Sequence, residues 1–436
     1  MASTVDQNLA VLRFMGAMKL PIHSAIALLL LSTCYLSIPL GQAPVKSIRK
    51  SASGVEHAKA LGHFYEALEQ VKVGSRLEPV KVIHFGDSHV AADILTRSIR
   101  DRLQTDFGDG GPGFIVPGNP MATKRARVST GVTDGWVVQG IGGKYSADRI
   151  YGPAGINLMT TTAGQQVWLE TASNHFEVYF VREPGGGSVE IRIDGTNELQ
   201  EPLSLSARTT KLDYLTFDLP DSGTHRLELR TLNNGRVRLL GIVAEQISPG
   251  VRYDVFGING AKANRLLTWN GPAFNAAIKA LAPDLIILAY GTNELTDGDW
   301  TTQSYQSLYG EIIQRLRVAA PEASILIVGP PDRGDVDVAA RLKLINESLR
   351  EVATVNETAF WSAYDAMGGT GSMNRWLRTG LAQEDRVHLT SAGYNVLGSR
   401  FYRDLMEGMK SGGRESGVRG RRSEVRSQRS GSGSGR

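Results

Sequence analysis

Cysteine is almost absent from this sequence. Cys34 is the only one among 436 residues, and it lies in an apolar stretch that covers residues 22–40. Cleavage after Ala43 leaves a mature chain without cysteine, which excludes disulfide bonds, thiol catalysis and cysteine metal sites. Metal-ligand spacing is also missing, so we expect neither a metal site nor a cofactor. The histidines without such spacing are His57, His63, His175 and His225.

Positive charge is scarce outside the C-terminal tail. The formal net charge of the chain is +4, and residues 411–436 carry seven Arg and two Glu. The tail alone is therefore +5, which leaves about −1 for everything before it. A body this close to neutral has no basic face for nucleic acid, and no nucleic-acid partner is expected. The tail has almost no apolar residues, which predicts disorder.

The first 43 residues are typical of an export signal. A basic stretch at Met18-Lys19 precedes the apolar residues 22–40, and the small residues of Gly41-Gln42-Ala43 follow where a signal peptidase cuts. The alternative is an uncleaved membrane anchor, because the apolar run approaches the length that spans a bilayer. We expect cleavage and a place in the periplasm or cell envelope. Membrane contact is expected only for an uncleaved or lipidated segment.

From residue 80 onward, apolar runs alternate with amphipathic helices. Strands are predicted over 82–85, 251–258, 285–290 and 325–329, and helices over 91–107, 271–281, 305–318 and 339–352. Continuous aliphatic runs suit strands that are buried on both faces of a parallel sheet. The alternation predicts an α/β fold with a doubly wound parallel sheet, in a flavodoxin-like three-layer arrangement.

Between residues 125 and 250 the pattern changes to short strands separated by turns. The predicted strands are 166–171, 176–182, 189–194, 214–219, 225–231 and 236–245. Their spacing indicates a β-sandwich or jelly roll, which we interpret as an inserted domain because it interrupts the α/β pattern. The predicted boundaries are 1–43 for the signal peptide or anchor, 55–124 and 251–410 for the two parts of the α/β domain, 125–250 for the insert and 411–436 for the disordered basic tail.

Three residues supply the parts of a serine hydrolase. Ser88 follows the predicted strand 82–85 in Gly86-Asp87-Ser88-His89, and Asp385 lies three residues before His388. His388 is suited to take the proton of the Ser88 hydroxyl near neutral pH, while Asp385 fixes the other ring nitrogen. No Gly-x-Ser-x-Gly sequence occurs, which argues against an α/β-hydrolase nucleophile elbow.

The candidate oxyanion donors follow strands of the same sheet. Ligands bind outside the carboxyl ends of the strands in open α/β sheets, and Ser88, Gly260 and Asn293 all follow predicted strands there. We expect the backbone amides of Ser88 and Gly260 and the side-chain amide of Asn293 to stabilise the oxyanion, with Asp87 in a supporting role. Singly these motifs are ordinary turns and helix caps. Their joint order carries the catalytic interpretation.

Other histidines and tryptophans have ordinary explanations. His84 and His89 flank the nucleophile motif, and we interpret both as packing or hydrogen-bonded residues rather than catalytic ones. Trp136 and Trp168 lie in the predicted insert. Both suit stacking on sugars, but packing in a core is the commoner role of such aromatic residues.

The sequence resembles the SGNH (GDSL) hydrolases. The four signature blocks of that family correspond to Gly86-Asp87-Ser88, Gly260, Gly291-x-Asn293 and Asp385-x-x-His388, with Glu294 where the third block usually has Asp. Over about residues 60–410 the chain is similar to the peptidoglycan O-acetylesterase branch, on the segments GDSHVAADILTRSIRDRLQ, FGDGGPGF, AMGGTGSMNRW and DRVHLTSAGY. The resemblance implies a carbohydrate-binding-like β-sandwich insert. It also implies removal of acetyl esters from cell-wall glycan through an acetyl-Ser88 intermediate.

The sequence is compatible with three functions. The first is an esterase acting on an acetylated cell-envelope glycan, with peptidoglycan favoured over other polysaccharides. The second is an O-acetyltransferase, which uses the same triad and passes the acetyl group to a sugar hydroxyl instead of water. The third is a carbohydrate-binding protein with a degenerate hydrolase domain. That last function requires a missing catalytic residue, and none is missing.

Overall fold

The computed structural model describes residues 54–429 except 121–124, 142 and 299. The predicted signal segment, residues 1–43, lies outside the described residues. In the described part of the chain, no helix combines the length and the hydropathy needed to cross a bilayer.

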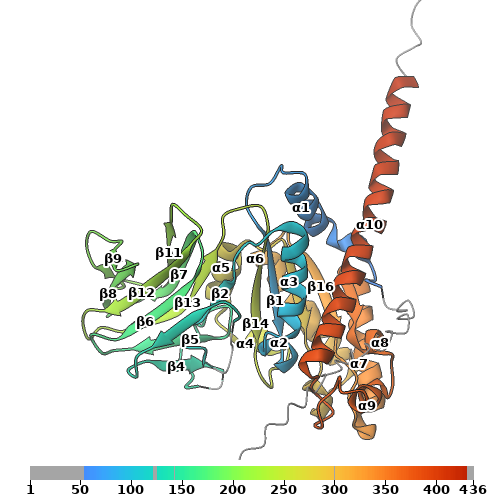
Figure 1. The fold of residues 1–436 in the computed structure, drawn as a ribbon. Helices are drawn as coiled ribbons and strands as arrows, with labels where there is room; N and C mark the ends of the chain where they lie inside the picture. Colours follow the sequence, from blue (N-terminus) through green and yellow to red (C-terminus); the bar gives the residue numbers. More distant parts are fainter. Residues whose placement is uncertain (1–53, 121–124, 142, 299, 430–436) are drawn as a thin grey trace, which may run out of the picture. The chain divides into compact units, whose positions relative to one another are not determined.

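A five-stranded parallel sheet forms the centre of the α/β region (Figure 1). Its strands, in spatial order, are β14 (Val251–Gly257), β1 (Val80–Gly86), β15 (Leu285–Ala289), β16 (Ser324–Gly329) and β17 (Ala359–Ser362). All neighbouring pairs are parallel. The four strands predicted from the apolar runs are present. β17, a run of four residues, is the strand that the apolar pattern did not predict.

Helices cover both faces of this sheet. In β1, Val82 belongs to one hydrophobic core and Ile83 to the other, because successive side chains of a strand point to opposite faces. The Val82 face packs against α1 (Gly62–Lys72), α3 (Leu95–Phe107), α8 (Ala363–Met367), α9 (Ser372–Arg378) and α10 (Ser391–Arg429). The Ile83 face packs against α4 (Arg265–Thr268), α5 (Gly271–Leu281), α6 (Thr302–Ala319) and α7 (Ala339–Val355). The fold is the predicted doubly wound three-layer α/β arrangement.

Two six-stranded antiparallel sheets form a β-sandwich between β1 and β14 in the sequence. One sheet contains β3 (Ser129–Val132), β6 (Gln166–Ala172), β8 (Ser188–Ile193), β9 (Thr196–Asn197), β10 (Leu203–Ser204) and β12 (Thr224–Thr231). The other contains β2 (Gly113–Ile115), β4 (Val137–Gly140), β5 (Ile156–Thr160), β7 (His175–Arg182), β11 (Lys211–Asp218) and β13 (Val237–Glu245). β2 precedes residue 125, the predicted start of the insert, yet it pairs with β13 of the sandwich.

The sandwich shares a hydrophobic core with the Ile83 face of the parallel sheet. Phe114 of β2 meets Phe256 of β14 edge-on, with ring centroids 5.3 Å apart, and the ring of Phe85 of β1 also lies 5.3 Å from that of Phe256. The Asp254 carboxylate also accepts the backbone N–H of Phe114 at 2.7 Å. The two regions are thus joined by buried contacts as well as by the chain.

Residues 411–429 belong to the tail, 411–436, for which the sequence predicts disorder. These residues continue helix α10, which begins at Ser391. Extending an existing helix adds one hydrogen bond per residue and avoids the cost of nucleation, so a sequence too polar to fold alone can continue a packed helix.

Candidate active site

Ser88 stands where β1 turns into α2 (Ser88–Ala91). Asp87 is the N-cap of this short helix and accepts the backbone N–H of His89 at 3.0 Å, so the predicted supporting residue fixes the turn. A Cβ at Gly86 would lie 2.3 Å from Cγ2 of Val90 and 2.8 Å from the Ala289 carbonyl oxygen. Only glycine therefore fits the close turn that presents the half-buried Ser88.

The three predicted triad residues form one chain of hydrogen bonds. His388 Nε2 lies 2.8 Å from Ser88 Oγ, and His388 Nδ1 lies 2.7 Å from Asp385 Oδ2. Because a carboxylate only accepts hydrogen bonds, Nδ1 carries the proton that it donates to Asp385. Nε2 is then free to accept the hydroxyl proton of Ser88, which is the arrangement that activates a serine nucleophile.

Asp385 is fixed by its own loop. Its Oδ1 accepts the backbone N–H groups of Val387 and His388, both at 2.9 Å. Partial burial acts to raise the pKa of Asp385, but these backbone bonds and the His388 contact outweigh it and hold the pKa below its usual value. The carboxylate stays ionised near neutral pH and stabilises the imidazolium that forms during catalysis.

The predicted oxyanion residues Gly260 and Asn293 lie on two loops that are tied together. Asn293 Nδ2 donates to the Ala261 carbonyl at 2.8 Å, which leaves its second amide proton for a ligand. Gly260 is exposed and has φ of +72°, a backbone conformation that favours glycine. The backbone N–H of Ile258 donates to the Gly86 carbonyl at 3.0 Å, which joins the Gly260 loop to the Ser88 turn.

Ser88 also offers its backbone amide. It is the first residue of α2, and the first N–H groups of a helix have no acceptor within that helix. The three predicted donors therefore come from the ends of β1, β14 and β15, which are neighbours in the parallel sheet. This is the position in which backbone and side-chain N–H groups stabilise a developing oxyanion.

Glu294 has a position beside the oxyanion residues that the sequence did not predict. Its Oε1 accepts the backbone N–H of Ala263 at 2.8 Å, so it provides a second tie between the two oxyanion loops. Burial raises the pKa of Glu294 to about 7. The sequence has Glu294 where the third block usually has Asp, and this departure was the signal. The side chain of Glu is longer than that of Asp, and it reaches the backbone N–H of Ala263.

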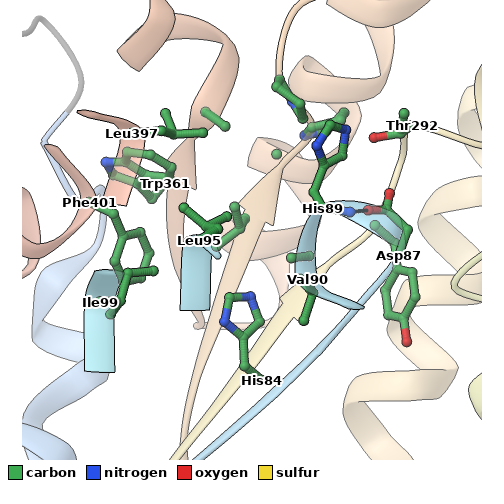
Figure 2. A pocket seen from close by; sticks show the side chains of 17 residues that line it. His84, Asp87, His89, Val90, Leu95, Ile99, Thr292, Trp361, Leu397 and Phe401 are labelled. Carbon is green, nitrogen blue, oxygen red and sulfur yellow. Dashed lines mark hydrogen bonds between the residues drawn. The ribbon is translucent and has the colours of Figure 1, made fainter. Parts of the chain in front are cut away.

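A cavity of about 30 Å³ lies beneath the nucleophile turn and is lined by His84, Asp87 and His89 (Figure 2). His89 Nδ1 is 2.9 Å from the Tyr394 hydroxyl, and the His89 and His388 rings lie 5.4 Å apart. His84 Nδ1 is 2.8 Å from the hydroxyl of Tyr253. Burial lowers the pKa of His89, and lowers that of His84 to about 3, so both rings stay neutral. The prediction that both are packing, hydrogen-bonded residues is confirmed.

The two insert tryptophans make contacts within the sandwich. Trp136 is 9% exposed and donates Nε1–H to the Gln166 carbonyl at 3.0 Å, so it is a core residue. Trp168 is half-buried on β6, with the Arg226 guanidinium 4.4 Å from its ring centroid. Within the described residues, no group of three His, Cys, Asp or Glu side chains is arranged to hold a metal ion.

Comparison with known proteins adds a family and a fold. The GDSL-like lipase/acylhydrolase family matches residues 221–396. A solved structure described as "Peptidoglycan O-acetylesterase in action, 5 min" is 26% identical, with a TM-score of 0.68, over 80% of this chain and 96% of that one. No curated protein matches.

Two further structural matches are weak. The salicylyl-acyltransferase SsfX3 of a tetracycline biosynthetic pathway has a TM-score of 0.30 at 16% identity, over 64% of this chain and 98% of its own. A family two carbohydrate esterase from Cellvibrio japonicus has a TM-score of 0.27 at 15% identity, over 65% and 98%. At these TM-scores neither match carries an argument.

Proposed function

Since this chain belongs to the SGNH (GDSL) hydrolase family and is an esterase, we propose that it removes O-acetyl groups from a cell-envelope glycan, and that this glycan is peptidoglycan. The observation that carries the proposal is the hydrogen-bonded chain from Ser88 Oγ through His388 to Asp385. The exported location expected from the N-terminal segment agrees with such a substrate, and we propose the periplasm or cell envelope as the place of action.

Acylation begins with attack of Ser88 Oγ on the acetyl carbonyl carbon. His388 Nε2 takes the hydroxyl proton as the C–O bond forms, and Asp385 stabilises the resulting imidazolium. The carbonyl oxygen becomes an oxyanion that accepts hydrogen bonds from the amides of Ser88, Gly260 and Asn293. Collapse of the tetrahedral intermediate breaks the bond to the sugar oxygen. That oxygen leaves as a hydroxyl with the proton from His388, and acetyl-Ser88 remains.

Deacylation repeats these steps with water. His388 Nε2 takes a proton from a water molecule as its oxygen attacks the acetyl carbon of acetyl-Ser88. The second tetrahedral intermediate uses the same oxyanion donors and then expels Ser88 Oγ, which recovers its proton from His388. Acetate leaves and the free serine is restored.

The choice of glycan has a separate support. The similarity to the peptidoglycan O-acetylesterase extends over 80% of this chain, which is more than the α/β region alone. A relative that shares both regions is a better guide to the substrate than one that shares the triad only, because the regions around a triad determine which ester reaches it. Acetylated peptidoglycan is therefore the substrate that we propose.

The test is acetate release from O-acetylated peptidoglycan by the purified protein and by Ser88→Ala. We expect release that depends on Ser88. If the protein hydrolyses an aryl acetate in a Ser88-dependent way but releases no acetate from peptidoglycan, the esterase activity stands and peptidoglycan is refuted as the substrate. Transfer of acetyl groups to sugar hydroxyls, in place of free acetate, would replace the hydrolase by a transferase.

A further inference from the structure

A cavity of about 310 Å³ lies outside the Ser88–His388–Asp385 triad. We call it the Glu294 cavity, and its lining includes Lys262, Asn264, Glu294, Trp300, Tyr305 and Leu308. Its volume is within the range of about 300–1,000 Å³ in which small molecules bind. The proposed mechanism uses no part of this space.

The cavity begins at the oxyanion loops. Lys262 is two residues after Gly260, and n residues span at most about 3.6 Å each, so their backbones lie within about 7 Å. Glu294 directly follows Asn293, with Cα atoms about 3.8 Å apart. The cavity therefore lies close to the two loops that bind the acetyl group in the proposed mechanism.

Two buried polar groups of the cavity lack partners among the described residues. Glu294 is 3% exposed, and its Oε2 makes no hydrogen bond although Oε1 is bound to Ala263. The indole Nε1 of Trp300 is also buried and makes no hydrogen bond to the described residues. Buried polar atoms are nearly always hydrogen-bonded, and leaving one unpaired costs about 1–3 kcal/mol. The cavity therefore borders on polar groups that the described residues leave without a hydrogen bond.

The charges of the cavity favour a neutral ligand. The ammonium of Lys262 is paired with the carboxylate of Asp297, so it is compensated within the protein. The remaining buried group, Glu294, is an acid without a cation partner in the described part of the chain. A phosphate or carboxylate placed beside it meets no free positive charge, whereas an uncharged sugar meets only hydrogen-bonding groups.

The apolar side of the cavity is aromatic. The Trp300 and Tyr305 rings lie 5.4 Å apart, and Leu308 extends the surface along α6. Aromatic faces combined with a few directed polar groups are the usual composition of a site that binds and orients a small molecule. An N-acetylated pyranose has C–H groups for the aromatic side and hydroxyl and amide groups for the polar lining residues, Glu294 among them.

We propose that the Glu294 cavity is a subsite for the neutral N-acetylhexosamine that neighbours the acetylated sugar in the glycan strand. The inference rests on the proposed function, which supplies the glycan. Of the two sugars that alternate in peptidoglycan, one carries a lactyl carboxyl group and the other is uncharged. The absence of a free cation among the described lining residues selects the uncharged one.

The test is binding of N,N′-diacetylchitobiose to the full-length protein, measured by calorimetry. The probe contains no ester, so binding is read without catalysis. We expect saturable binding that weakens at least tenfold in Trp300→Ala. Tyr145→Ala, which removes a 62% exposed aromatic residue outside the cavity, serves as the matched control and should bind like the wild type.

A second variant guards against misfolding of Trp300→Ala. Asn264 lines the cavity, is exposed and makes no side-chain cap bond to α4, so Asn264→Trp narrows the cavity without breaking a helix cap, and Asn264→Ala leaves the cavity open. We expect the ratio of kcat/KM on O-acetylated peptidoglycan fragments to kcat/KM on an aryl acetate to fall tenfold in Asn264→Trp only.

Two results would overturn the subsite. One is an absence of binding at millimolar probe, and the other is binding that Tyr145→Ala weakens as much as Trp300→Ala. Either result applies even if the enzyme releases acetate from peptidoglycan. Conversely, a protein that binds the probe in the cavity but releases no acetate from peptidoglycan would retain the subsite and lose the proposed substrate.

Discussion

The parallel sheet and the β-sandwich are both extensive β structures, but only one of them gathers the proposed chemistry. Burial along β1 and β15 is nearly continuous, whereas β6 and β12 alternate between buried and half-exposed positions. All strands of the parallel sheet end at one edge, so residues distant in sequence meet there. In an antiparallel sandwich the carboxyl ends of the strands are divided between the two opposite ends of each sheet. The side chains of these strands mainly pack against each other.

A cluster of buried charges joins the two regions. Arg252 of β14 is fully buried and pairs with Glu245 of β13 and, at 3.0 Å, with Asp254. Its guanidinium also donates to the Leu281 carbonyl at 3.1 Å. We therefore expect substitutions at the carboxyl ends of the parallel sheet to change activity and substitutions in this charge cluster to change stability. Substitutions on the outer face of the sandwich should change little.

The largest effect is expected at the nucleophile. Ser88→Ala should lower kcat on an aryl acetate by about 10⁶-fold, or about 8 kcal/mol, because triad members act as a unit. His388→Ala should match it, and Asp385→Ala should cost less, about 10⁴-fold. The melting temperature should not fall, since Ser88 is only half-buried. Ser75→Ala, at an exposed serine, is the control. Retained activity in Ser88→Ala would eliminate the mechanism.

The next effect concerns stability at the junction. Arg252→Ala leaves Asp254 without its cation and Glu245 with only the Lys81 ammonium, at 3.7 Å, which should destabilise the fold by about 3–5 kcal/mol in denaturant unfolding. Arg226→Ala is the matched control, because this arginine is 38% exposed and pairs with Glu228 on the outer sandwich face. Its cost should be at most about 1 kcal/mol. Equal costs for the two variants would mean that the buried cluster does not join the regions.

The third effect is at the oxyanion loops. Asn293→Ala removes one oxyanion donor and the tie to the Ala261 carbonyl, and kcat should fall by about 10²–10³, or about 3 kcal/mol. Steady-state kinetics on an aryl acetate, with circular dichroism to verify folding, measures it. A variant with normal kcat would refute the oxyanion assignment and leave the triad intact.

Sequence patterns predicted the parts of the molecule that follow from local periodicity. The aliphatic runs predicted the strands β1, β14, β15 and β16. The order of the motifs predicted Ser88 and Asn293 at strand ends, and Asp385 and His388 together on one loop. The helix predicted over 91–107 is present as α3, but it begins only at Leu95, after the short helix α2. Between them, Asp93 adopts φ of +50° and pairs with Arg100 at 2.9 Å and with Arg125 at 3.1 Å.

What the sequence did not predict depends on contacts between distant segments. Arg125 is far from Asp93 in the chain, and no periodicity of the sequence indicates that the two residues form an ion pair between α2 and α3. The same holds for the Glu294 cavity, whose walls come from the loop after β14, the turn after β15 and the start of α6. Local patterns indicate which residue types are present at a strand end, and tertiary packing decides which space they enclose.

The fourth prediction is a pH dependence of stability that originates in Glu294. Its pKa of about 7 in the folded protein exceeds the usual value of 4.5, so the folded state holds this proton more tightly than the unfolded state. The contribution of this group to the free energy of unfolding is complete below pH 4.5, declines as the pH rises and is lost above pH 7. The total change is at most about 3 kcal/mol. Glu294→Gln keeps the acceptor for Ala263 and should remove this slope. Parallel unfolding curves from pH 5 to 8 would contradict the raised pKa.

The smallest effect is expected on the outer face of the sandwich and tests the comparison directly. Trp168 is covered by the Arg226 guanidinium, so Trp168→Ala should change kcat/KM on O-acetylated peptidoglycan less than twofold. Its cost in stability should be about 0.5–1 kcal/mol, the value of an exposed cation–π contact. Trp300→Ala, measured beside it, should lower the same kcat/KM tenfold. If Trp168→Ala lowered kcat/KM tenfold and Trp300→Ala changed it less than twofold, the glycan would bind on the sandwich and not beside the parallel sheet.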